Sequence, residues 1–131
     1  MVKKWIVIIS IMIALGIGCY YENKYVNKAF DSMVTSLTTF KEMLNLTEAD
    51  INTTQNVEYL NNLHKEFHKK EKALKALIWH TGLKDVEVGI SRILTYVEES
   101  DYTEALTETN ALLDYCKHYS MDFEINLENI L

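Results

Sequence analysis

Residues 26–44 read VNKAFDSMVTSLTTFKEML, and the spacing of apolar side chains in this stretch decides the fold class. Successive apolar positions are separated by alternating steps of four and three residues. They are Val26, Phe30, Met33, Leu37, Phe40 and Leu44. Such steps place side chains on one face of an α-helix, as in a heptad seam. The pattern predicts a helix over residues 21–46 that buries one face against other helices.

The rest of the chain continues in the same way, with no proline in 131 residues to interrupt a helix. Apolar positions at helical spacing predict a second helix over residues 47–79, a third over 82–99 and a fourth over 101–119. The last residues, FEINLENIL (123–131), alternate briefly between apolar and polar. This alternation predicts an extended or single-turn tail docked on the helices.

The predicted helix starts carry capping signals. Two pairs of residues resemble a helix start in which a side chain accepts a hydrogen bond from a free backbone N–H. They are Thr47 with Asp50, and Asp101 with Glu104. Thr81-Gly82 is expected to interrupt the helix and so to separate the second helix from the third. Four amphipathic helices with short connections predict an all-α fold, an antiparallel four-helix bundle. Stacked helical hairpins are the alternative, because DYTEAL (101–106) resembles one helix of a tetratricopeptide repeat.

Upstream of the bundle, residues 5–21 read WIVIISIMIALGIGCYY and carry no charge. Seventeen helical residues span about 25 Å, close to the thickness of a bilayer core. Lys3 and Lys4 precede the segment, and Trp5 and the Tyr20–Tyr21 pair lie where interfacial aromatic residues are expected. We expect residues 1–21 to be a single-pass transmembrane anchor continuous with the first bundle helix.

Positive charge at the N-terminus favours a cytoplasmic N-terminus, with residues 22–131 outside the cytoplasm at the cell membrane. Two alternatives stay open: a cleaved signal peptide, and a lipoprotein lipidated at Cys19. Within the segment, small residues recur every fourth position at Ser10, Ala14 and Gly18. This transmembrane packing stripe lets another membrane helix approach closely and predicts an integral membrane protein partner besides membrane lipid.

The charge balance excludes one class of partner. Residues 22–131 carry 11 basic and 19 acidic side chains, a net charge of −8. Such a surface repels phosphates, so we expect no nucleic-acid partner. Residues 64–75 are locally basic (+3) and residues 98–128 locally acidic (−8). We expect the two regions to pair within the bundle; the alternative is that the basic face meets lipid head groups or a partner.

His64, His68 and Glu71 have a spacing that could hold a metal on one helix. Three lysines crowd this site and oppose a cation: Lys65, Lys69 and Lys70. The zincin pattern also needs a glutamate directly after the first histidine, where Lys65 stands. We therefore expect His64 at the edge of the apolar seam, His68 in solvent, and no metal or other cofactor.

Other polar residues fit structural roles. His80 precedes Thr81-Gly82, where the helix dipole favours a histidine. Cys116 falls on the inner face of the fourth helix and His118 on another face, so the sequence places no Cys-His pair. Four acidic residues cluster around the turn between the predicted third and fourth helices, which fits a solvated helix face plus a cap. They are Glu98, Glu99, Asp101 and Glu104. No catalytic motif or small-molecule substrate is evident, and we expect a non-enzymatic protein.

The layout resembles domain-of-unknown-function family 4363, short single-pass helical proteins of endospore-forming Gram-positive bacteria. The lysine-flanked apolar segment, EYLNNLHKEFHKKEKALKALIWH (58–80), LKDVEVGISRILTYVEESDYTEAL (83–106) and ENIL (128–131) carry the resemblance. His80 matches a histidine of the family, whereas Phe67 stands where the family favours tryptophan. The resemblance implies a membrane location, no known activity, and a multi-pass membrane protein encoded nearby.

These observations predict a membrane-tethered accessory or interaction module that acts with an integral membrane protein. The alternative function is an extracytoplasmic bundle that senses a small ligand bound between its helices.

Overall fold

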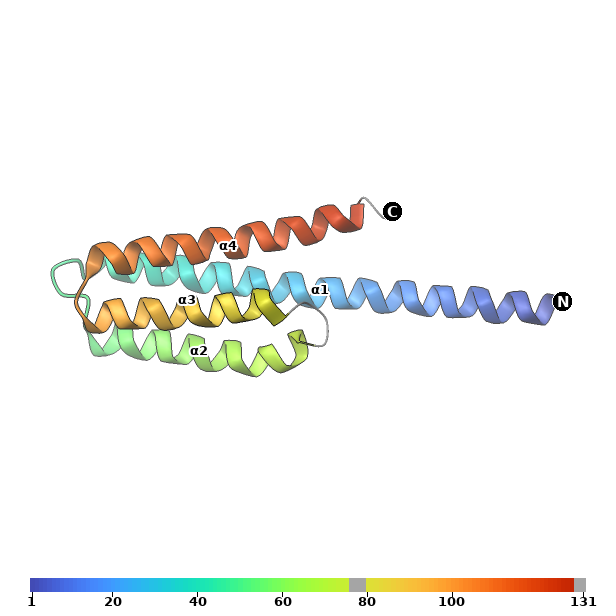
Figure 1. Ribbon diagram of the computed structural model, residues 1–131, viewed down its shortest axis with the longest axis horizontal. Coiled ribbons are helices and arrows are strands. Elements are labelled where there is room, and N and C mark those ends of the chain that lie inside the picture. Colours follow the sequence, from blue (N-terminus) through green and yellow to red (C-terminus); the bar gives the residue numbers. More distant parts are fainter. Residues whose placement is uncertain (76–79, 129–131) are drawn as a thin grey trace.

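The computed structural model describes residues 1–75 and 80–128, with side chains described in residues 1–75 and 82–118. Four α-helices and no strand occur in this part of the chain. They are α1 (Val2–Leu46), α2 (Thr54–Leu74), α3 (His80–Glu98) and α4 (Tyr102–Glu128). Successive helices run in opposite directions (Figure 1). The expected all-α fold is confirmed.

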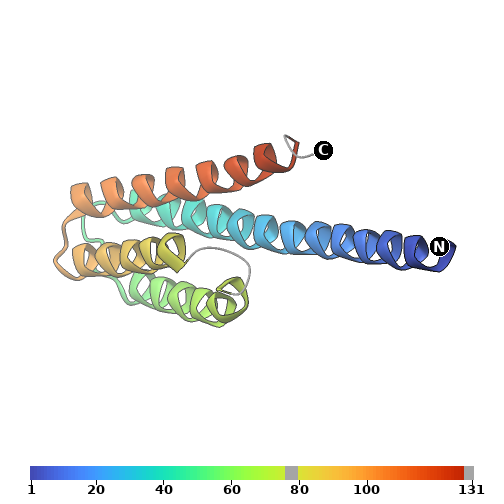
Figure 2. The same ribbon diagram turned by 45° about the vertical axis from the view of Figure 1, so that its right-hand side comes forward.

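The helices form a closed ring rather than a stack of hairpins. Each helix packs against its two neighbours in the ring, α1 on α2, α2 on α3, α3 on α4, and α4 on α1. Within the described residues, no contacts join the diagonal pairs α1–α3 and α2–α4. Figure 2 shows the same arrangement from another side. Four stripes of apolar side chains therefore meet on one central axis, as in an antiparallel four-helix bundle.

The predicted apolar face of α1 forms one side of this core. Its six positions from Val26 to Leu44 are all at most 6% exposed, and Leu37 and Phe40 are fully buried. The other helices contribute at the same three-and-four spacing. Their buried apolar residues include Leu60, Leu63, Phe67, Leu74, Leu83, Val86, Ile90, Ile93, Val97, Ala105, Leu112, Leu113 and Cys116. Phe40 also stacks on the ring of Tyr59 from α2, with centroids 5.9 Å apart.

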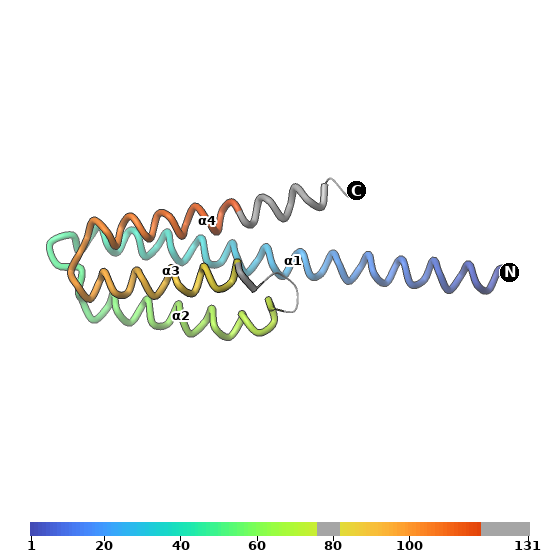
Figure 3. Tube along the Cα trace, viewed as in Figure 1, coloured from blue at the N-terminus to red at the C-terminus, as the bar shows by residue number. Residues whose placement is uncertain are grey.

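α1 is much longer than its neighbours. Its 45 residues correspond to about 68 Å of helix, and its N-terminal half projects beyond the bundle (Figure 3). All of residues 1–22 are exposed. No residue between the apolar segment and Val26 breaks the helix, so the predicted continuity is confirmed.

The start of α2 differs from the sequence-based prediction. Residues 47–53 form a loop, and the helix begins at Thr54 with Thr53 as its N-cap, whose hydroxyl accepts from the Asn56 N–H at 3.1 Å. Thr47 does not cap a helix because its hydroxyl donates to the Met43 carbonyl. Buried Asn56 donates to Thr47 Oγ1 and to the Ile51 carbonyl, both at 2.9 Å. The loop is thus held in place by a polar side chain from the first turn of α2.

The C-terminal tail also differs from the prediction. Residues 123–128 continue α4 instead of forming an extended tail, because no glycine or proline interrupts the chain after Gly89. α4 runs back beside the long α1 (Figure 1). Residues 76–79 and 129–131, which hold the predicted end of the second helix and most of ENIL, lie outside the described residues.

Candidate membrane-facing and polar sites

The apolar segment, residues 5–21, is the largest exposed apolar surface of the described chain. Its isoleucines, leucine, valine and methionine are between 49% and 67% exposed. α1 is the one described helix with a window long and apolar enough to cross a membrane, and none of that window is buried. Contiguous apolar surface of this extent marks a contact with lipid or protein, because water solvates it poorly.

The predicted packing stripe lies on this exposed segment. Ser10 donates its hydroxyl to the Ile6 carbonyl at 2.8 Å, so the side chain is satisfied within its own helix. A Cβ atom built on Gly18 would meet nothing within 4 Å. Ser10, Ala14 and Gly18 therefore leave the helix backbone open to close approach from outside.

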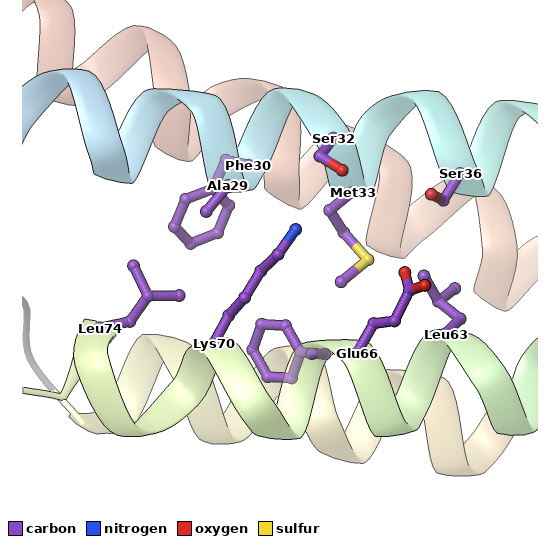
Figure 4. Close-up of a pocket in the computed structure, with 10 residues that line it drawn as sticks. Ala29, Phe30, Ser32, Met33, Ser36, Leu63, Glu66, Lys70 and Leu74 are labelled. Carbon is purple, nitrogen blue, oxygen red and sulfur yellow. The ribbon is translucent and has the colours of Figure 1, made fainter.

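A shallow groove separates α1 from α2. Its floor is formed by Phe30 and Met33 from α1 with Leu63, Phe67 and Leu74 from α2. Glu66 and Lys70 of α2 extend across it toward the small residues of α1 (Figure 4). The cavity measures about 20 Å³, which is room for about one water molecule. Pockets for drug-sized ligands typically measure about 300–1,000 Å³.

The histidines of α2 lie in a polar cluster, one member of which, on α3, was not predicted from the sequence. His64 Nε2 lies 3.4 Å from Glu87 Oε1 on α3, and His68 Nδ1 lies 3.9 Å from the same oxygen. His68 Nδ1 also lies 3.2 Å from Glu71 Oε2. The expected position of His68 in solvent is confirmed, since its side chain is 64% exposed. Glu87 was missed, although its position next to buried Val86 placed it at the edge of the seam.

Other candidate residues take the structural positions predicted for them. Cys116 is fully buried, and this burial raises the pKa of its thiol to about 12. His118 is exposed, with Nδ1 2.7 Å from the Asp114 carbonyl. Asp101 Oδ1 accepts from the Glu104 N–H at 3.1 Å, as expected for an N-cap. His80 is an exception: it is the first residue of α3, so its expected position near the C-terminal end of the second helix is wrong, and its side chain lies outside the described residues.

The expected pairing of the basic and acidic regions is wrong. The basic region lies on α2 and the acidic region mainly on α4, and these two helices are diagonal in the ring. Lys75, at the end of α2, instead pairs with Glu71 of its own helix at 3.3 Å. The basic side chains on the outer face of α2 are thus left facing outward.

The geometry defines a class of protein: a four-helix bundle whose first helix extends as an exposed apolar rod. The comparison of the sequence with known families gives a more particular result. Residues 20–130 match DUF4363, a domain of unknown function, and the chain belongs to this family. The match begins at the end of the apolar segment and covers the whole bundle. No curated protein and no solved structure matches the chain.

Proposed function

We propose that this protein is a non-enzymatic, membrane-tethered accessory module that acts with an integral membrane protein. The exposed apolar half of α1 is the observation that carries the proposal. Seventeen uncharged residues lie outside the bundle. Insertion into a bilayer would remove the apolar side chains of such a segment from water. In this proposal the segment spans the cell membrane, and the bundle stands outside the cytoplasm.

The helical continuity of α1 supports an accessory role over a simple tether. The same helix provides both the membrane segment and one wall of the core, so a rotation or tilt within the membrane is transmitted to the bundle. A flexible linker would uncouple the two parts. A module built in this way is suited to follow, or to restrain, a partner within the membrane.

The basic end of α2 also fits a membrane location. α2 runs antiparallel to α1, and Leu74 packs beside Ala29 and Phe30 in the α1–α2 groove. Ala29 lies eight residues beyond Tyr21, which corresponds to about 12 Å along the helix. Lys72 and Lys75 therefore lie near the expected head-group region, where a lysine can pair with a lipid phosphate.

The alternative function, sensing of a small ligand, gains no support from the core. The α1–α2 cavity has room for about one water molecule, and the groove floor is apolar. We retain the interaction module as the proposed function.

Site-directed photo-cross-linking tests the proposed partner. A photoreactive residue at Ala14 lies on the packing stripe, whereas one at Met12 lies about 200° around the same helix. We expect Ala14 to give a discrete adduct with a multi-pass membrane protein in living cells, and Met12 to give little or none. Both variants have the same depth in the membrane, so Met12 is the matched control.

Adducts are identified by mass spectrometry after solubilisation. Absence of a protein adduct at Ala14, equal adducts at both positions, or an adduct only with a second copy of the chain would contradict the proposal.

A further inference from the structure

The polar cluster on the outer α2–α3 face has the composition of a transition-metal site. It combines imidazole and carboxylate groups from two helices. The ligand atoms of His68, Glu71 and Glu87 all lie within 4.8 Å of one another. His64 lies beside this set, next to Glu87. We propose that His68, Glu71 and Glu87 bind a divalent transition-metal ion such as Zn²⁺.

The distances suit a small ion. Zinc binds nitrogen and carboxylate oxygen at about 2.0–2.2 Å in tetrahedral geometry, which places neighbouring donor atoms about 3.3–3.5 Å apart. The separations here are 3.2 Å for His68–Glu71, 3.4 Å for His64–Glu87 and 3.9 Å for His68–Glu87. The ligand atoms of Glu71 and Glu87 lie within 4.8 Å of each other, and rotation of the exposed His68 and the partly exposed Glu87 would bring the three groups closer to the tetrahedral spacing.

Glu71 gives the site its rigidity. Its side chain is only 7% exposed, and a buried carboxylate is stable only when it is paired. Lys75 pairs with Oε1 at 3.3 Å, while Oε2 faces His68. The two oxygens therefore hold different partners, and Oε2 is free to bind a metal without displacing the lysine. The lysine also orients the carboxylate, as outer groups commonly do at metal centres.

One of the lysines that argued against a metal is placed less unfavourably than the sequence suggested. Lys70 extends into the α1–α2 groove, away from the α3-facing side of α2 (Figure 4). Lys69 lies about 100° around the helix from His68, whereas Lys65 lies about 60° from it and remains a neighbour. The two carboxylates within the cluster match the +2 charge of the metal, while Lys75 adds one positive charge beside Glu71. Imidazole ligands favour Zn²⁺ and related metals over Mg²⁺ or Ca²⁺, which prefer oxygen alone.

Bound metal would join the last turns of α2 to the first turns of α3. Metal that binds only the folded state raises the free energy of unfolding, and this stabilisation grows with the logarithm of the free metal concentration above the Kd. The test uses the full-length protein in detergent with Cys19→Ser, because an exposed thiol can itself bind zinc. Zn²⁺ binding is followed by calorimetry, Co²⁺ binding by visible absorption, and stability by thermal unfolding.

We expect one equivalent of Zn²⁺ to bind saturably and to raise the unfolding midpoint. His68→Gln and Glu87→Gln should each weaken binding by at least about tenfold and remove the stabilisation by zinc. Both side chains are substantially exposed, so these variants should fold. His118→Gln and Glu99→Gln, exposed residues outside the cluster, are the matched controls. The proposal fails if no saturable binding occurs, or if H68Q and E87Q bind as tightly as the controls.

Discussion

At the scale of single residues, the turn between α3 and α4 shows how a local backbone motif ends a helix. The N–H of Ser100 donates to the Val97 carbonyl at 3.0 Å, and the N–H of Asp101 donates to the Tyr96 carbonyl at 2.9 Å. These two bonds form a Schellman motif, which places one residue in the left-handed region. That residue is Ser100, with φ 56°. Glycine is usual at this position because it has no Cβ to strain the backbone.

Replacing this serine with glycine should stabilise the protein. Ser100→Gly removes the left-handed strain, and we expect the free energy of unfolding to rise by about 0.5–1 kcal/mol. Ser91→Gly, at an exposed position within α3, is the control and should lower it by about 0.5 kcal/mol because glycine disfavours helix. Urea unfolding followed by circular dichroism measures both. Equal destabilisation by the two variants would show that the turn is not strained.

At the scale of elements, the apolar periodicity of α1 was sufficient to predict which of its residues are buried. Every predicted seam position of α1 lies in the core, because the period of the pattern matches the period of the helix. The loop over residues 47–53 was not predictable in this way. Thr47 and Asp50 have capping chemistry, yet the buried amide of Asn56 bonds the loop itself. The Glu87 partnership depends on which helices become neighbours, and no single-helix pattern contains that information.

At Gly89 the helix α3 lies close to Leu112 of α4, and a side chain there should push the two helices apart. A Cβ on Gly89 would lie 3.0 Å from Leu112 Cδ1 and 3.2 Å from Cδ2. Leu112 is itself only 5% exposed, so most of its surface is already packed. We expect Gly89→Val to lower the free energy of unfolding by about 1–3 kcal/mol, the usual cost of overpacking.

Thr95→Val, at an exposed position of the same helix, is the control for Gly89→Val. It introduces the same side chain and should change stability by no more than about 0.5 kcal/mol. Thermal unfolding compares the two variants. A Gly89→Val protein as stable as the control would mean that α3 and α4 are less tightly packed than the distances indicate.

At the scale of the whole molecule, the two ends of the bundle differ in chemistry. The apolar segment emerges at one end, where α2 ends and α3 begins, and α4 runs back toward the same end (Figure 1). The opposite end carries the 47–53 loop and the acidic turn between α3 and α4. If the segment spans the membrane, the acidic turn is the part of the bundle farthest from lipid. Its accessibility from outside the cell is therefore the most direct measure of topology.

The proposed topology predicts that Glu99 faces the outside of the cell. Glu99 is exposed in the acidic turn, so Glu99→Cys in a Cys19→Ser background supplies a reporter thiol. Cys116 stays in place because its buried thiol, with a pKa near 12, is neutral at pH 7 and should react only after unfolding. We expect a membrane-impermeant maleimide to label Glu99→Cys in intact protoplasts.

The matched control carries the reporter at the other end of the same chain. Val2→Cys, also in the Cys19→Ser background, lies before the apolar segment and should be labelled only after lysis. The parent protein without a reporter should be labelled only after denaturation, which reports Cys116. Reversal of the two reporters would place the bundle in the cytoplasm. The N-terminal lysines and the bundle lie at opposite ends of one continuous helix. Labelling of both reporters in intact protoplasts would therefore mean that the apolar segment does not span the membrane.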